Sequence, residues 1–415
     1  MRWREATLGE LAERDSGLVQ TGPFGSQLHQ SDYLPDGIPV IMPKDIEEGR
    51  VSVESVARVS EETVNRLQRH KLKPRSIVLP RRGEVTKRAF IRAEQEGWLC
   101  GTGCLKIELG GRELVPEYLY YFMEQDQVVQ WLEQHAVGTT MLNLSAGIVA
   151  DLPIRYPGVD AQNAIASTLT AYDELMENNR RRMGLLDEAA RLLYREWFVR
   201  LHFPGHEHAH LTHGLPEGWE RKTLIEVCGS LEDGDWIESK DQGGEDYRLL
   251  QISNIGMNDF IETGNYRFIS QETFRRLNCR EVKPDDLLIS RMPTPIGRAW
   301  LVTEMPWKMV TAVDAAILTT DDTVADRYFL LYHLNSPSSI EHCERRAVGA
   351  TRPRVARREL AGIPVLLPPG SLQREFREIV KPINEQRTNL YRQNQKLRAA
   401  RDLLLPRLMS GEIAV

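Results

Sequence analysis

The sequence predicts a mixed α/β fold, of the α+β kind, with two similar domains and two long helices. Three observations support this fold class: the chain repeats itself once, each copy begins with short β-type runs, and each copy ends in a long helical segment. The 415 residues suffice for two or three domains with sizeable cores. A composition of 41% hydrophobic and 27% charged residues is typical of a folded globular protein and excludes a disordered one.

The first observation is the repeat. WREATLGE at 3–10 recurs as WERKTLIE at 219–226. Gly138 in AVGT matches Gly349 in AVGA, and other matched positions also lie about 210 residues apart. A long period that occurs only twice is not that of a solenoid, whose units have about 20 to 50 residues. We therefore expect two similar domains related by a pseudo-twofold axis.

The second observation is the texture of each copy. Short runs rich in β-branched and apolar residues, such as SIVLPR at 76–81 and DLLISR at 286–291, are separated by glycine and proline. Single helical stretches interrupt them, as at 116–135. This texture predicts mixed α/β domains. The predicted boundaries are a first domain at 1–159, a first long helix at 160–203, a second domain at 204–370 with a linker at 204–215, and a second long helix and tail at 371–415.

The third observation is an apolar pattern at the end of each copy. Apolar residues recur in alternating steps of four and three, which is typical of a coiled coil. A helix of about 40 residues is on the order of 60 Å long. If the twofold axis passes between the two helices, they lie antiparallel. The predicted coiled-coil seam includes Leu169, Tyr172, Asn179, Leu186, Leu193, Ile383, Leu390, Asn394, Leu397 and Leu404.

Two asparagines lie close to the middle of this seam, Asn179 just before it and Asn394 just after the matching point. We predict that they hydrogen-bond to each other, which would fix the register of the two helices at some cost in stability; the alternative is that both remain separately solvated. The sequence leaves both alternatives open.

Signatures of catalysis and of export are missing from the sequence. It contains no Gly-x-x-x-x-Gly-Lys-Ser/Thr phosphate loop, no Gly-x-Gly-x-x-Gly turn after a strand and no His-Glu-x-x-His. The five cysteines form no Cys-x-x-Cys pair, which argues against a zinc ribbon or a disulfide framework and fits a reducing compartment. The first ten residues carry charges where a signal peptide would need its apolar core, so we expect no export signal, and no apolar stretch approaches 18 residues. We expect a cytoplasmic protein.

Five of the ten histidines lie within one segment of twelve residues: His202, His206, His208, His210 and His213. Alternating histidines could bind a transition metal. The segment also joins the first long helix to the second copy, so a solvated linker is the favoured interpretation. No metal site is predicted.

The net charge of −6 is unevenly distributed. Residues 371–410 carry nine basic and four acidic side chains, 345–358 hold six arginines and no acid, and 81–88 hold four basic residues and one acid. Arginine-rich loops suit phosphate and guanine recognition because a guanidinium binds in a bidentate manner, although charge runs are also common on solvated surfaces. The stretch 232–246 has seven acids and one lysine. We expect it to face solvent or a basic partner rather than a DNA groove.

Several longer motifs occur in a fixed order. They are WREATLGEL and GLPEGWERKTL at the two domain starts, TGPFGSQL at 21–28, GIPVIMPKDI at 37–46, GTGCLKI at 101–107, VGTTMLNLSAGIVADLPI at 137–154 and LLLPRLMSGEI at 403–413. With these motifs the whole chain resembles the specificity subunits of type I restriction-modification enzymes. The second copy departs from the pattern at its start, where DGDWIESKDQGG replaces the GPFGS-like segment.

The resemblance implies a non-catalytic DNA reader for defence against foreign DNA. Two target recognition domains would each read one part of a split, asymmetric double-stranded DNA sequence, and the antiparallel helices would set the distance between the parts. The helices would dock two methyltransferase subunits, which methylate adenine at N6 with S-adenosylmethionine. Two ATP-driven restriction subunits, with ATP and Mg²⁺, would complete the nuclease, so no cofactor is expected in this chain.

On this basis we predict specific DNA contacts, which are Arg81, Arg82, Lys87, Arg88, Thr139 and Thr140 in the first domain and Arg291, Arg352 and Arg354 in the second. For Thr139 and Thr140, a structural turn at Gly138 is at least as good an interpretation. Alternatives for the whole chain are a coiled-coil scaffold, a DNA-binding protein of a methylation-only defence system, or a stand-alone enzyme with diverged motifs.

Overall fold

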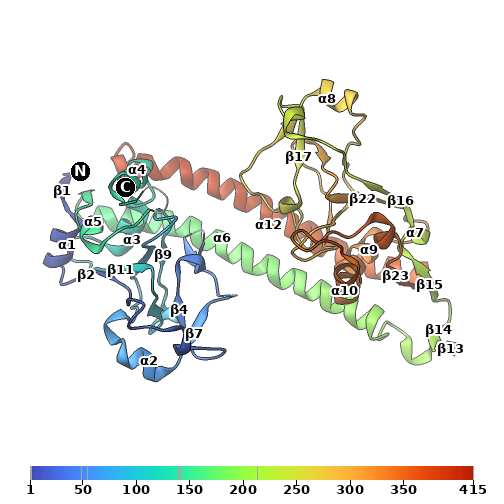
Figure 1. The fold of residues 1–415 in the computed structure, drawn as a ribbon, viewed down its shortest axis with the longest axis horizontal. Coiled ribbons are helices and arrows are strands. Elements are labelled where there is room, and N and C mark those ends of the chain that lie inside the picture. Colours follow the sequence, from blue (N-terminus) through green and yellow to red (C-terminus); the bar gives the residue numbers. More distant parts are fainter. Residues whose placement is uncertain (1, 48, 54, 139–141, 213, 415) are drawn as a thin grey trace. The chain divides into compact units, whose positions relative to one another are not determined.

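The chain forms two compact units, which are described separately. The computed structural model describes residues 2–47, 49–53, 55–138, 142–212 and 214–414. The first unit combines Met1–Asn178 with Gln393–Val415, and the second unit is Asn179–Arg392. Figure 1 shows the two long helices, α6 in green and α12 in red. The sequence prediction treated the helices as separate from the domains, whereas each compact unit includes part of both helices.

The first unit alternates short strands and helices and then enters the long helix α6. Its elements are β1 (Arg4–Thr7), α1 (Leu8–Arg14), β2 (Leu18–Thr21), β3 (Tyr33–Leu34), β4 (Ile38–Ile41), β5 (Ile46–Glu47), β6 (Arg50–Val51), β7 (Ala57–Val59), α2 (Glu61–Arg66), β8 (Ile77–Pro80), β9 (Ala89–Phe90), β10 (Leu99–Cys100), β11 (Cys104–Glu108), α3 (Pro116–Phe122), α4 (Asp126–His135), α5 (Ala146–Ala150), β12 (Pro153–Tyr156) and α6 (Val159–Tyr194).

The main sheet of the first unit has the strand order β2-β11-β8-β9, and all neighbouring strands are antiparallel. A second sheet has the order β10-β4-β7-β3, in which β10 and β4 are parallel. The strands β5 and β6 form a small antiparallel pair. The first strand, β1, pairs with β12, which leads directly into α6.

The second unit repeats this succession of elements. They are β13 (Leu211–Thr212), β14 (Leu215–Pro216), β15 (Glu220–Thr223), α7 (Leu224–Val227), β16 (Cys228–Asp233), β17 (Tyr247–Leu250), β18 (Phe268–Ile269), α8 (Gln271–Arg276), β19 (Leu287–Ser290), β20 (Ala299–Leu301), β21 (Lys308–Thr311), β22 (Ala315–Thr320), α9 (Arg327–Leu334), α10 (Pro337–Arg346), α11 (Arg357–Ala361), β23 (Pro364–Leu367) and α12 (Gly370–Ser410). A π-helical turn, Arg195–Val199, follows α6.

The sheets of the second unit match those of the first. The order β16-β22-β19-β20 corresponds to β2-β11-β8-β9, and β15 pairs with β23 as β1 does with β12. The sheet β18-β17-β21 contains one parallel pair, β17 with β21, like β4 with β10. The predicted mixed α/β fold in two similar copies is therefore confirmed.

Equivalent turns lead into β8 and β19. Each begins with Lys-Pro and then has a residue with positive φ, 70° at Arg75 and 75° at Asp285. The next side chain accepts a hydrogen bond from the lysine amide, at 3.3 Å for Ser76 and 2.9 Å for Asp286. Such side-chain acceptors stabilise tight turns. The apolar strands that follow are completely buried, so their ends lie at fixed places at the edge of the core.

The core of the first unit is built from the sheet, the helices α3 to α5 and both long helices. Leu8, Leu105 and Leu119 are completely buried in it. From α12 it receives Leu405, Leu408 and Met409, which are also buried. Burial of one such side chain contributes about 1.5–3 kcal/mol, so the last turns of α12 are a substantial part of this core.

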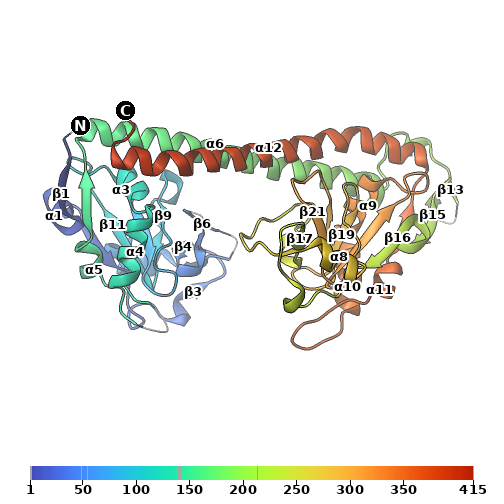
Figure 2. The same cartoon turned by 90° about the horizontal axis from the view of Figure 1, so that it is seen from above.

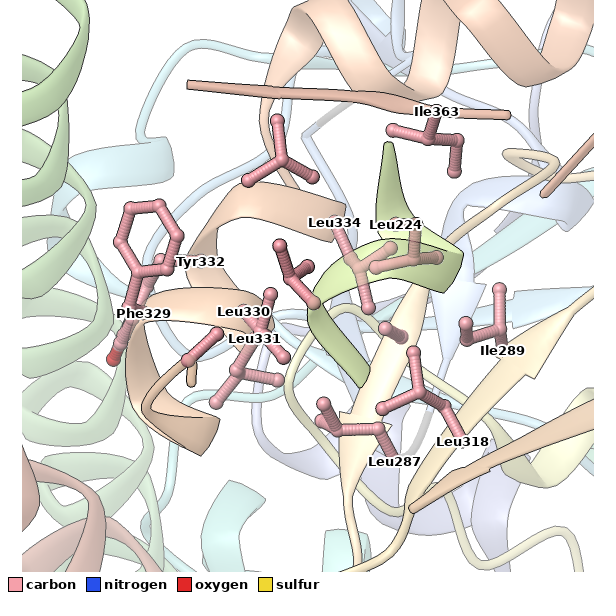
Figure 3. Close-up of a cluster of buried hydrophobic side chains, with 14 of the residues drawn as sticks. Leu224, Leu287, Ile289, Leu318, Phe329, Leu330, Leu331, Tyr332, Leu334 and Ile363 are labelled. Atoms are coloured by element: carbon pink, nitrogen blue, oxygen red, sulfur yellow. The ribbon is translucent and has the colours of Figure 1, made fainter. Parts of the chain in front are cut away.

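The core of the second unit has the same plan. Figure 3 shows the buried residues of α9 lying between the main sheet and the green helix α6, with Phe329 and Tyr332 on the side of the helix. The ring of Tyr194 on α6 lies 6.0 Å from the Phe329 ring and 6.1 Å from that of Phe376 on α12. The helices are thus part of the packed interior.

Within each unit the two helices run antiparallel, side by side (Figures 1 and 2). In the first unit, Asp173 pairs with Arg401, and the carbonyl of Met176 accepts a hydrogen bond from Asn394. The residue number therefore rises on α6 while it falls on α12. In the second unit, Tyr194 contacts Phe376, and Asp187 pairs with Arg387.

Candidate nucleic-acid interface

An arginine follows the buried central strand at the same position in both units. Arg81 comes directly after β8, and Arg291 comes directly after β19. The amide of Arg81 donates to Gly103 (2.6 Å) and its carbonyl accepts from Leu144 (2.8 Å). The amide of Arg291 donates to Asp314 (2.9 Å) and its carbonyl accepts from Val355 (3.0 Å). The shared hydrogen bonds fix both arginines at equivalent places.

A short loop lies beside each of these arginines. Two backbone hydrogen bonds of 2.9 Å close the loop between Val137 and Asn143, and two of 3.0 Å close the loop between Val348 and Arg354. The glycine after each valine has a φ that favours glycine, 119° at Gly138 and 125° at Gly349. In the second unit the loop projects on the side away from α12 (Figure 2). Thr139 and Thr140, two predicted contacts, lie outside the described residues.

Both loops expose apolar side chains. Val137 is 66% exposed and Val348 is 80% exposed. Each loop thus presents one exposed valine at an equivalent position beside the strand-end arginine. The loops and the adjoining strand-end arginines are therefore the candidate interface.

In the first unit, Arg81 and Arg82 lie on this surface. Arg82 is exposed and has no hydrogen bond or ion pair from its side chain to any residue that the structure describes. The Arg81 guanidinium lies 5.7 Å from the ring centroid of Phe24. Lys87 is half-buried and pairs with Glu84, so its charge is partly compensated within the loop.

Arg88, in contrast, is an interior residue. Its Nε donates to the Tyr120 carbonyl (3.0 Å), its guanidinium lies 5.1 Å from the Tyr120 ring centroid, and it pairs with Glu124 (3.0 Å). Only 10% of its side chain is exposed. The structure therefore places the Arg88 side chain in the interior of the unit, and its role as a DNA contact stays a prediction.

The Arg291 side chain is directed inward in the same way, and its role as a DNA contact also stays a prediction. Its Nε donates to the Val355 carbonyl (3.0 Å), and one terminal nitrogen donates to the Val313 carbonyl (3.1 Å) and pairs with Asp233. Burial lowers the pKa of its guanidinium, and the charge of Asp233 opposes this shift. Its donors are directed toward the protein, so Arg291 holds the loop rather than reaching outward.

The other arginines near this loop of the second unit differ in their exposure to solvent and in the partners of their side chains. Arg352 is exposed and its side chain has no partner among the described residues. Arg354 is half-buried, donates to the Val313 carbonyl and lies 3.5 Å from Asp314. Arg357, which was not among the predicted contacts, is exposed and lies 3.7 Å from Asp233. The candidate charged surface of this unit is therefore centred on Arg352, Arg354 and Arg357.

The acidic stretch 232–246 is largely compensated within its own unit. Four of its acids pair with basic side chains: Glu232 with Arg280, Asp233 with Arg291, Glu238 with Lys240 and Asp241 with Arg276. The basic partners expected from the sequence thus belong to the same chain. This pairing reduces the repulsion that the stretch would exert on a polyanion.

All ten predicted seam residues of the helices are buried or half-buried. The polar interruptions of the pattern carry ion pairs. Arg401 pairs with Asp173 (2.9 Å) and with Glu124 (2.7 Å), and Arg387 pairs with Asp187 (3.2 Å). Burial opposes the charge of Arg401, but Glu124 and Asp173 outweigh it and raise its pKa. These arginines tie the helices to each other and, through Glu124, to the α/β part.

The asparagine pair stays a prediction. Asn179 is 2% exposed and belongs to the second unit, whereas Asn394 belongs to the first and donates to the Met176 carbonyl (3.0 Å). The two asparagines belong to different units, and each unit is described by itself. The predicted hydrogen bond between their side chains is therefore untested.

The described residues offer no group of three or more His, Cys, Asp or Glu side chains that could hold a metal ion. His202 and His206 are neighbours, with ring centroids 5.3 Å apart, and both are exposed. His213 lies outside the described residues. Within the same ranges, no helix has the length and apolar composition needed to cross a membrane.

Comparison with known proteins identifies the family. Residues 2–183 match the family model described as "Type I restriction modification DNA specificity domain". A 323-residue stretch is 23% identical to the type I restriction enzyme MjaIX specificity subunit of Methanocaldococcus jannaschii and covers 75% of this chain and 73% of that one. The chain is therefore similar to type I specificity subunits, and its residues 2–183 match their DNA specificity domain. The resemblance in the sequence motifs is thereby confirmed.

Other members of the family agree with this assignment. The chain is 19% identical over 392 residues to the HindI specificity subunit of Haemophilus influenzae, covering 78% of this chain and 83% of that one. Its fold is similar to the crystal structure of a type I restriction-modification S subunit from M. genitalium, with a TM-score of 0.57 and 18% identity over 98% of this chain and 96% of the other. The chain therefore shares the fold of that S subunit along nearly its whole length.

Proposed function

We propose that this specificity subunit reads a bipartite, asymmetric double-stranded DNA site, one part with each unit. The observation that carries the proposal is the same construction in both units: a strand-end arginine is fixed by two backbone hydrogen bonds, and it lies beside a loop whose ends are joined by two more, Val137 to Asn143 and Val348 to Arg354. A loop next to a buried strand end suits recognition, because the scaffold positions the loop while its side chains contact base edges.

The two surfaces differ in the residues they present, which supports an asymmetric site. The first unit offers Arg82 beside its strand end, where the second has Met292. The second unit offers Arg352 and Arg354 in its loop, where the first has Asn143 in place of Arg354. Different donors and acceptors select different bases, so the two parts of the site have different sequences.

In this proposal the chain is non-catalytic and its partners supply the chemistry. Two methyltransferase subunits would bring S-adenosylmethionine, and two restriction subunits would bring ATP and Mg²⁺, in the cytoplasm. Exposed apolar residues of α6 in the second unit offer a docking surface: Leu185 and Leu192 are seven residues apart and are 66% and 40% exposed. Residues seven apart lie on one helix face.

The test is reconstitution with the methyltransferase subunits of the same system. The chain plus these subunits is expected to bind and methylate duplexes selectively, with salt-dependent affinity, whereas methyltransferase alone would not be selective. The positions of N6-methyladenine in a host genome with and without this chain identify the site. An unchanged methylation pattern after deletion of the chain would exclude the proposal. Addition of the restriction subunits with ATP separates a complete nuclease from a methylation-only system.

A further inference from the structure

Each unit exposes one large aromatic ring close to its strand-end arginine. Phe24 in the first unit is 52% exposed, and Trp236 in the second is 69% exposed. The two segments share no motif, since TGPFGSQL stands in one and DGDWIESK in the other. Exposure of a large ring leaves apolar area in water at about 25 cal/mol per Å², so its presence at comparable places in both copies needs an explanation.

Backbone geometry shows that the two rings occupy equivalent positions. Each lies two residues after a glycine at the end of the first strand of the main sheet. The Gly22 amide donates to the Cys104 carbonyl (2.9 Å), and the Gly234 amide donates to the Ala315 carbonyl (2.9 Å). A Cβ on either glycine would collide with a carbonyl oxygen of the neighbouring segment. The glycines therefore let both segments pack closely against the sheet, which fixes the backbone two residues before each ring.

In the first unit the ring belongs to the candidate interface. The Phe24 carbonyl accepts from the Gln27 amide (2.8 Å), and the Phe24 amide donates to the Gln27 side chain (3.2 Å), so the segment forms a closed turn. The guanidinium of Arg81 lies 5.7 Å from the ring centroid. The aromatic ring and a cationic strand end are thus presented together.

In the second unit the same segment is tied to the arginines of the loop. The Asp235 carbonyl accepts from the Val313 amide (3.1 Å), and the Val313 carbonyl accepts from Arg291 (3.1 Å) and from Arg354. The indole N–H of Trp236 donates to Glu238 (3.0 Å), and Lys240 neutralises that carboxylate at 2.7 Å. Trp236 therefore lies at a locally compensated point of the acidic stretch, next to the charged surface.

We propose that Phe24 and Trp236 are DNA wedges, each inserting against one base step of the part of the site that its unit reads. This inference rests on the proposed function and adds to it a class of contact that the arginines cannot make. Aromatic and aliphatic side chains that enter a base step unstack it, and stacking of a ring on a base is insensitive to salt. Both rings are exposed; the Arg81 guanidinium lies beside Phe24, and Lys240 neutralises the Glu238 carboxylate that Trp236 contacts.

The experiment uses the complex with methyltransferase subunits and a duplex that contains the mapped site, with 2-aminopurine placed at successive positions. In wild type, 2-aminopurine fluorescence is expected to rise at one step in each part of the site. Phe24→Ala is expected to abolish the rise in one part and Trp236→Ala in the other, each with about 10-fold weaker binding and an unchanged slope of log Kd against log salt.

Conservative and control variants complete the test. Phe24→Trp and Trp236→Phe are expected to restore both signals. Leu34→Ala and Val324→Ala remove side chains that are 46% and 41% exposed elsewhere in the two units, and they are expected to bind like wild type. If the alanine variants bind like wild type, or if the fluorescence rise persists, the wedge is excluded while the proposed function stands. If the wild-type complex binds no duplex selectively, the proposed function itself fails.

Discussion

Arg81 and Arg291 occupy the same position in the two units, but their guanidinium groups point to different partners. That of Arg81 lies beside the exposed ring of Phe24, whereas that of Arg291 is buried against Asp233 and two backbone carbonyls. At the same position of the repeated fold, the arginine thus lies beside an exposed ring in one copy and forms buried hydrogen bonds in the other. The charged residues that remain available for DNA differ accordingly between the units.

The first prediction concerns Arg352, the free arginine of the second loop. Arg352→Ala is expected to weaken binding of the complex to its site by about 1–3 kcal/mol and to relax the preference at one base position, because a bidentate contact would be lost. Competition binding against single-base variants of the site measures both effects. Arg374→Ala, which removes the same charge from an exposed position of α12, is the control. A uniform loss over all sequences would assign Arg352 to a phosphate instead.

The second prediction separates Arg88 from Arg82. Arg88→Ala is expected to lower the free energy of unfolding by about 2 kcal/mol, because Glu124 and the Tyr120 carbonyl lose a partner. Arg82→Ala, at an exposed site, is expected to leave stability unchanged and to weaken DNA binding. Chemical denaturation and a DNA binding assay of both variants check this pattern. The reverse pattern would restore Arg88 as a DNA contact.

The third prediction concerns Asp314, which lies 3.5 Å from Arg354. Asp314→Asn is expected to raise the affinity of the complex for non-specific duplex several-fold and to steepen the salt dependence by about one counterion, because Arg354 would be free to meet a phosphate. Binding titrations at several salt concentrations measure the slope. Glu375→Gln, an exposed acid on α12, should change neither quantity. An unchanged slope in Asp314→Asn would show that Arg354 does not reach DNA.

The fourth prediction concerns the buried pair of Arg387 and Asp187. Their side chains are 7% and 14% exposed, so a double-mutant cycle with alanine is expected to give a coupling of about 1–3 kcal/mol. The exposed pair of Lys381 and Glu385 on the same helix, at 3.9 Å, is the control and should couple by less than about 0.5 kcal/mol. Equal coupling in both cycles would mean that burial adds nothing to the first pair.

The fifth prediction is a loss of stability in mild acid. Burial lowers the pKa of His333 from 6.5 to about 4, and its Nδ1 lies 2.9 Å from the Tyr194 hydroxyl. As the pH falls, this histidine is protonated in the unfolded chain before it is protonated in the folded one. The free energy of unfolding is therefore unaffected by the titration of His333 above pH 6.5, and it decreases between pH 6.5 and 4 by on the order of 3 kcal/mol.

Unfolding at pH 7.5 and at pH 5 should show this loss in wild type. His333→Asn should show a smaller loss, and His208→Asn, at an exposed position, should behave like wild type. The residual loss in His333→Asn is expected to come from His70, whose pKa is also lowered to about 4. Equal acid sensitivity of all three proteins would contradict the prediction.

Periodic features were readable from the sequence because they repeat. The Pro-Gly breaks before Asp160 and Ser371 placed the helix starts at these two residues, and the structure begins α6 at Val159 and α12 at Gly370. The match of Gly138 with Gly349 identified the two loops, because glycine is required there by φ. Local patterns of this kind reflect local physics, so one sequence suffices to find them.

The contacts of single arginines were not readable in the same way. Arg88 is neutralised by Glu124, and Arg291 by Asp233, 58 residues away. Charge counts do not report which arginines the fold turns inward. Phe24 and Trp236 were missed because their segments differ in sequence, and only the hydrogen bonds of Gly22 and Gly234 reveal the equivalence.

The division of the helices between the units has a consequence for synthesis. The second unit is one continuous stretch, Asn179–Arg392, whereas the first needs Leu405, Leu408 and Met409 to complete its core. These residues leave the ribosome after the whole of the second unit. The N-terminal unit therefore completes its folding last, the reverse of the usual order for successive domains, and until then its open core is a natural substrate for chaperones.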